Sequence, residues 1–230
     1  MPRRRSRDPS TGRIDNGLRP VMIPAPCMGA KMGLTLEILG LIIFLGAHVF
    51  VSLRDRRAAL ISSIGRGPYL GLFSVASIVG LLLLGYGFAR YRAEGIIPLW
   101  YPPAWTRHIV VAAMWPASIA VVAAYVPGNI KRALKHPMLV GVKLWAVAHL
   151  CANGDLGGII LFGGVLAWAV YDRISLKHRT DSGSPPIKMG GFGNDIIAII
   201  LGTILYAVLG LLFHPLVIGL PAFGTPAFGH

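Results

Sequence analysis

Charged residues, and acidic ones above all, are scarce in this chain of 230 residues, and so is cysteine. Only 13% of the residues are charged, against about a quarter in a typical soluble domain. The two cysteines, Cys27 and Cys151, provide neither a disulfide framework nor a zinc site. These shortages exclude a soluble enzyme and a secreted disulfide-rich protein.

Apolar residues, in contrast, make up 54% of the chain, and the mean hydropathy is +0.65. The net charge is +13, but the basic residues lie between long apolar runs. This arrangement is typical of the flanks of membrane helices and not of a nucleic-acid-binding surface. The sequence therefore predicts an integral membrane protein that contacts the lipid bilayer and no nucleic acid.

The apolar runs predict an all-α fold, a polytopic membrane bundle of about six transmembrane helices. A helix needs roughly 20 apolar residues to cross the hydrocarbon layer of about 30 Å. The runs that we interpret as helices are 34–53, 69–89, 109–126, 138–152, 156–171 and 196–218. The fourth and fifth are short and are separated only by the tripeptide NGD at 153–155. We expect them to form a tight hairpin that either spans the membrane or re-enters it.

Lysine and arginine concentrate in the odd-numbered loops, which hold eleven of them against three in the even-numbered loops. Cytoplasmic loops carry the excess of basic residues, so we expect the odd loops in the cytoplasm and both termini outside. The basic, disordered tail expected at 1–31 opposes this orientation, and it is no signal peptide. We predict that translation starts at Met32, leaving a transmembrane domain at 32–220 and a short tail at 221–230. A cytoplasmic tail with another topology is the alternative.

Three histidines, His48, His149 and His214, lie within the apolar runs. An ionisable side chain in the membrane normally faces a partner, a cavity or a cofactor. Two imidazoles on facing helices form a common haem site, whereas a structural hydrogen bond is the alternative for each histidine. His214 precedes Pro215 near the outer end of the last run, so an interfacial position is favoured there.

Helical spacing gives two of these histidines polar or aromatic companions. Trp145, His149 and Asn153 follow one another at intervals of four residues and form one stripe. Glu37 shares a face of the first helix with His48. The two histidines differ in depth, roughly 8 Å against 17 Å from the cytoplasmic ends of their helices, so a shared haem requires helix tilt.

Four segments together resemble the NnrU family. They are LGLIIFLGAH at 39–48, PGNIKRALKHPML at 127–139, LWAVAHLCANGDL at 144–156 and GIILFGGVLAWAVYDR at 158–173. The similarity covers roughly residues 32–220. The bacterial member that gives the family its name is associated with denitrification, in the expression or maturation of nitrite and nitric oxide reduction. The plant and cyanobacterial relative is zeta-carotene isomerase, a membrane enzyme that binds haem b and isomerises a cis double bond of a carotenoid.

The resemblance implies haem b as a cofactor, with His48 and His149 as the axial ligands of its iron. The isomerases carry a cysteine three residues before the second histidine, where this chain has Ala146. A mechanism that exchanges a thiolate at the iron is therefore not supported here, and no catalytic residue is assigned. The supporting residues of the expected site are Trp145, Asn153, Asp155 and Glu37.

Two functions follow as hypotheses, both in a bacterial inner membrane. The first is a haem-binding protein with redox or carotenoid isomerase-type chemistry on a hydrophobic polyene. The second is a non-enzymatic accessory or maturation factor that contacts a nitrogen-oxide reductase. A small transporter is disfavoured, because the sequence has no repeats and no pair of broken helices at corresponding positions.

Overall fold

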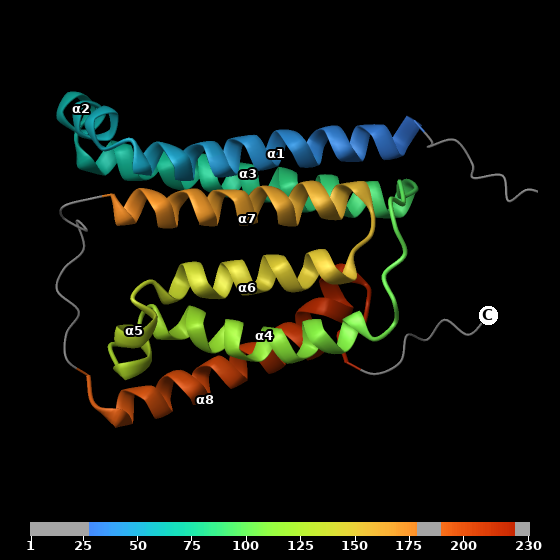
Figure 1. The fold of residues 1–230 in the computed structure, drawn as a ribbon. Helices are drawn as coiled ribbons and strands as arrows, with labels where there is room; N and C mark the ends of the chain where they lie inside the picture. Colours follow the sequence, from blue (N-terminus) through green and yellow to red (C-terminus); the bar gives the residue numbers. More distant parts are fainter. Residues whose placement is uncertain (1–27, 179–189, 224–230) are drawn as a thin grey trace, which may run out of the picture.

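The computed structural model describes residues 28–178 and 190–223, and within them the chain is a bundle of long helices (Figure 1). An isolated bridge between Pro98 and Asp155 is the one β-type pairing in these residues. The all-α membrane bundle predicted from the sequence is therefore confirmed. In chain order the helices are α1 (Met28–Ser52), α2 (Arg54–Ile64), α3 (Arg66–Glu94), α4 (Thr106–Ala123), α5 (Asn129–Leu134), α6 (Pro137–Ala152), α7 (Leu156–Lys177), α8 (Phe192–Val208) and the π-helical η1 (Leu209–Ile218).

Five segments of the described chain are long and apolar enough to cross a membrane. They are Lys31–Ser52, Arg66–Glu94, Thr106–Ala123, Leu156–Lys177 and Phe192–Ile218. The remaining apolar helix, α6, has 16 residues and is about 24 Å long at 1.5 Å per residue. Of the two helices expected to be short, only α6 is so, because α7 continues to Lys177 and has 22 residues.

The helices pack in two groups that the α6–α7 hairpin connects (Figure 1). In one group α1 packs against α3 and α7, and in the other α4 packs against α6 and α8. Large apolar side chains cover the outside, such as Leu82, which is 67% exposed, and Leu216, which is 79% exposed. Such a surface suits contact with lipid and not with water. The small apolar core consists of Leu41, Leu84, Leu161, Phe162 and Val165.

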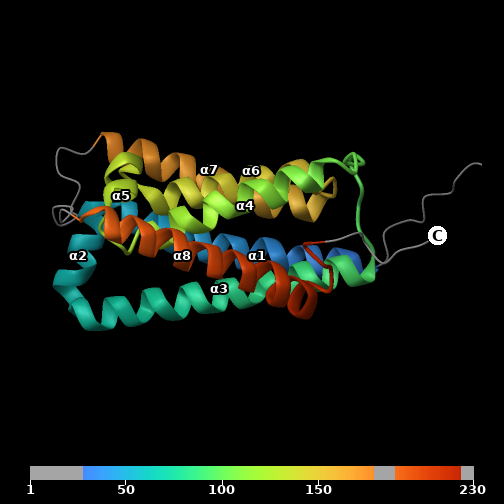
Figure 2. The same cartoon turned by 90° about the horizontal axis from the view of Figure 1, so that it is seen from below.

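The short helices α2 and α5 lie at the end of the bundle opposite the α6–α7 turn, and Figure 2 shows α2 crossing the bundle axis there. They belong to the first and third connections between the long helices, so these two odd-numbered loops lie at one end. Successive loops lie at opposite ends of a bundle when its helices run in alternate directions, as six membrane-crossing helices would. Which end faces the cytoplasm remains a prediction. The start at Met32 also remains one, because residues 1–27 lie outside the described part.

Glycines let the backbones of α1 and α3 come into direct contact. A Cβ atom built on Gly80 would lie 2.6 Å from the backbone nitrogen of Phe44, closer than real Cβ contacts come. Gly40 and Gly87 meet the opposite backbone in the same way, at Leu84 and at Glu37. Small residues allow two membrane helices to approach closely, and Gly80 has this role between α1 and α3.

Gly80→Ala is expected to destabilise the bundle by about 1–3 kcal/mol, because the backbone of α1 must move to admit the methyl group. Gly85→Ala on the same helix is the matched control, since nothing lies within 4 Å of a Cβ at that position. Alanine there should be neutral or slightly stabilising. Thermal unfolding in detergent, followed by circular dichroism, measures both. Equal melting temperatures would contradict the account of this contact.

Candidate functional site

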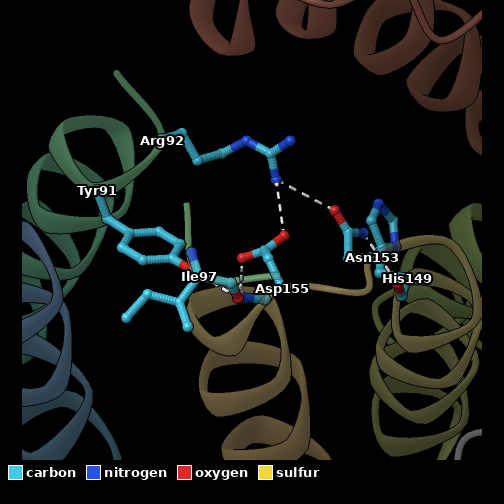
Figure 3. Close-up of polar contacts among 7 residues, drawn as sticks. Tyr91, Arg92, Ile97, His149, Asn153 and Asp155 are labelled. Carbon is cyan, nitrogen blue, oxygen red and sulfur yellow. Dashed lines mark hydrogen bonds and ion pairs between the residues drawn. The ribbon is translucent and has the colours of Figure 1, made fainter. Parts of the chain in front are cut away.

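The turn between α6 and α7 builds a polar cluster at one end of the bundle (Figure 3). Asp155, which is 4% exposed, is the N-cap residue of α7, and its Oδ1 accepts a hydrogen bond of 2.9 Å from the backbone nitrogen of Gly158. Its Oδ2 lies 3.4 Å from Nη1 of Arg92 on α3. The cap satisfies a backbone donor at the start of α7, and the ion pair connects α7 to α3.

Arg92 extends this cluster to α6. Its Nη1 donates to Oδ1 of Asn153 at 3.3 Å, and Nδ2 of Asn153 donates to the carbonyl oxygen of His149 at 2.8 Å (Figure 3). The guanidinium also lies over the ring of Phe88, 5.5 Å from its centroid. Sequence reasoning missed Arg92, because the apolar run ends at residue 89 whereas α3 continues to Glu94. A polar residue one turn after an apolar run is the signal that could have indicated it.

Two fully buried side chains lie beside this cluster, Tyr91 and Glu37, each 0% exposed. The hydroxyl of Tyr91 accepts a hydrogen bond of 2.8 Å from the backbone nitrogen of Ile97, which holds the α3–α4 connection against the cluster. Neither carboxyl oxygen of Glu37 has a hydrogen-bond partner among the described residues. A Cβ on Gly157 would lie 2.9 Å from Oε2 of Glu37, so the glycine allows α7 to close over this carboxyl group. Glu37 lies where α1, α3 and α7 meet.

His149 lies in the last turn of α6, on the stripe that helical spacing predicts. Its Nδ1 is 2.8 Å from the carbonyl oxygen of Trp145. Because a carbonyl oxygen only accepts, Nδ1 of the neutral ring carries the proton, and Nε2 is left with a lone pair. The imidazole stacks on Phe162 of α7 at 4.8 Å and lies 5.3 Å from the ring of Trp145. These contacts position the ring, and Nε2 is the nitrogen that could bind a metal ion.

His48 lies near the C-terminal end of α1, among aromatic rings. Its Nδ1 is 2.7 Å from the carbonyl oxygen of Phe44, whose own ring is 4.3 Å away. Phe73 of α3 and Trp168 of α7 each lie 5.3 Å from it, centroid to centroid. The local hydrogen bond is thus the same as that of His149, but the neighbours are different.

The structure does not bring His48 and His149 into ring contact in the part of the chain that it describes. Their ring neighbours form two sets without a common member. The neighbours on α7, Trp168 and Phe162, are six residues apart, which is about 9 Å along the helix axis. The difference in depth that the sequence indicates therefore persists in the folded chain.

His214 is the histidine that lies next to His149. Their ring centroids are 6.4 Å apart and the ring planes are inclined by 30°. The interfacial position expected for His214 stays a prediction, and the structure adds the contact with His149, both side chains being half-buried. Because η1 is a π-helix, it has more residues per turn than an α-helix, so its side chains leave the register that a period of 3.6 predicts.

Within the described residues no group of three or more His, Cys, Asp or Glu side chains is placed to hold a metal ion. The metal-binding side chains that lie close together are instead two imidazoles, those of His149 and His214. Such a donor set fits haem, because the porphyrin itself supplies four nitrogen ligands and the protein needs to supply only the axial ones. The residues at this end of the bundle therefore fit the cofactor that the family resemblance implies.

Comparison with known proteins bears on the whole of this region. A family model described as NnrU protein matches residues 36–222, which include His48, His149, His214 and the polar cluster. No curated protein and no solved structure matches the chain. Because the family model covers most of the sequence, this chain belongs to the NnrU family.

Proposed function

We propose that this membrane protein binds haem b inside its helix bundle, with His149 as an axial ligand of the iron. The observation that carries the proposal is the hydrogen bond from Nδ1 of His149 to the carbonyl oxygen of Trp145. A carbonyl acceptor on one ring nitrogen fixes the tautomer, orients the ring and increases the basicity of the other nitrogen. Phe162 and Trp145 add flat apolar surfaces on which a porphyrin edge can pack.

Arg92 is the residue that we propose for binding a haem propionate. Its contacts to Asn153 and Asp155 both use Nη1, whereas a guanidinium carries five N–H donors. The arginine side chain is 30% exposed, and Asn153 connects it to the helical turn that carries His149. A carboxylate that approaches this end of the bundle would form a charge-assisted hydrogen bond with the guanidinium.

The chemistry that we propose is redox or cis–trans isomerisation of a hydrophobic polyene, as in the isomerases that the sequence resembles. Bound haem would supply a one-electron partner or a Lewis acid for such a substrate. The bundle supplies the apolar surface along which a polyene can reach the site from the lipid. Ala146, which is 0% exposed on α6, occupies the position that is cysteine in the isomerases. Because alanine has no sulfur atom, this position offers no sulfur ligand here.

The test of the proposal is the haem content of the chain after purification in mild detergent from haem-replete cells, measured as the pyridine haemochrome. We expect about one haem b per chain, by the single-site chemistry of an axial histidine. Folded protein obtained at good yield without haem would overturn the proposal. A carotenoid isomerisation assay on the haem-containing protein then distinguishes an isomerase from an electron-transfer protein.

The second candidate is an accessory or maturation factor for nitrite and nitric oxide reduction, and helix α2 favours it. This helix crosses the end of the bundle, contains no buried residue and begins with the basic segment RDRR. An exposed, basic helix at the membrane surface is suited to contact a nitrogen-oxide reductase. Co-purification of a reductase subunit that is lost in Arg56→Glu, with no chromophore on the chain itself, would support this candidate.

A further inference from the structure

We infer that His214 of η1, and not His48 of α1, supplies the second axial ligand of the haem that His149 holds. This inference rests on the proposed haem binding and names the partner histidine at the same site. It departs from the ligand pair that the family resemblance implies. Three observations carry it: the spacing of the two rings, the geometry of η1, and the surroundings of His48.

The spacing of His149 and His214 matches that of two axial ligands. Metal–imidazole bonds are about 2 Å long, so the centres of two imidazoles on opposite sides of one iron lie about 6 Å apart. The observed separation of the ring centroids is 6.4 Å. The separation of the two rings in the folded chain therefore already matches that of two imidazoles bound to one iron.

The helix that carries His214 has an unusual backbone. The ten residues Leu209–Ile218 are π-helical and include Pro215, directly after His214. The π-helix is rare, and its single-turn form is frequently found at functional sites. The segment ends at Gly219 with φ of 76°, so the chain turns directly after η1. The imidazole that lies beside His149 is thus carried by a π-helical segment that ends in a turn.

The surroundings of His48 explain this side chain without a metal. Phe44, Phe73 and Trp168 surround its ring at 4.3 to 5.3 Å, which is the packing of a buried aromatic cluster. The Nδ1 contact to Phe44 is equivalent to the contact of His149 with Trp145, so the distinction between the two histidines rests on their neighbours and their positions. His48 also contacts α7 about 9 Å from the point where His149 contacts it. The position therefore suits a structural histidine.

The experiment compares His214→Ala with His48→Ala in the haem-containing full chain, by absorption and electron paramagnetic resonance spectra of the ferric state. The wild-type chain is expected to be six-coordinate and low-spin. In His214→Ala we expect retained haem and a shift to a high-spin spectrum, because one axial position opens. Imidazole added to this variant should restore the low-spin spectrum. His48→Ala should remain low-spin.

The opposite pattern, with a high-spin His48→Ala and a low-spin His214→Ala, would overturn the inference and leave the proposed haem binding intact. A wild-type chain without haem would overturn the proposed function itself, so the two failures are distinguishable. If His214→Ala gives little folded protein, His214→Met preserves a side chain of similar length and offers a sulfur ligand. We then expect a low-spin haem with a higher reduction potential, and an unchanged potential would contradict the inference.

Discussion

Replacing His149 by alanine is expected to leave the helix bundle folded and to remove the haem from the purified protein. The substitution deletes the imidazole that the structure holds between Phe162 and the carbonyl oxygen of Trp145. Changes to residues that merely support a metal ligand already lower metal affinity by about 10- to 100-fold, so loss of the ligand should lower haem content at least that far. The haem content per chain and the circular dichroism spectrum are the two measurements.

The matched control for this variant is His108→Ala, which removes an exposed histidine at the start of α4. It should keep the full haem content and the same helix content. If His149→Ala keeps the full haem content and the absorption spectrum of the wild-type protein, the iron is bound by other residues. Loss of haem in both variants would indicate a general effect of the substitutions and not a ligand role.

Asp155→Ala is expected to give the second large effect, a loss of about 2–4 kcal/mol of stability. The carboxylate of Asp155 caps α7 through Gly158 and pairs with Arg92. Loss of an N-cap costs about 1 kcal/mol. Removing the buried partner of an ion pair costs more, although the partial exposure of Arg92 reduces this contribution. Thermal unfolding in detergent measures the sum.

Two comparisons make the Asp155 prediction specific. Asp155→Asn keeps an oxygen that can accept the hydrogen bond from Gly158 but lacks the charge, so its loss of stability should be smaller. Asp55→Ala, at an exposed position in α2, should change the melting temperature little. If Asp155→Ala and Asp55→Ala unfold at the same temperature, the polar cluster does not stabilise the hairpin.

The helices themselves could be predicted because their cause is local. A membrane helix is recognised by the length of its apolar run, and each of the six predicted runs overlaps an apolar helix of the structure, the last one α8 together with η1. The helix ends could not be predicted equally well. Both α3 and α7 continue for about a turn or more beyond their apolar runs, to Glu94 and Lys177, because a charged residue at the membrane surface does not stop a helix.

The site divides in the same way between local and distant contacts. The contacts among Trp145, His149 and Asn153 follow from an interval of four residues on one helix, and the structure contains them. The contact of His149 with His214 joins segments far apart in the chain. It also depends on a π-helix, which the hydrophobic periodicity of the sequence does not predict. Such contacts arise from the tertiary arrangement, so a single sequence does not specify them.

The measurement that tests the central claim most directly is the absorption spectrum of the wild-type chain, oxidised and then reduced with dithionite. The protein is purified in mild detergent from haem-replete cells. An axial His149 with a second imidazole opposite it predicts a sharp Soret band and split α and β bands after reduction, as in six-coordinate low-spin haem. A featureless spectrum from well-folded protein would contradict the account and leave the accessory function as the better proposal.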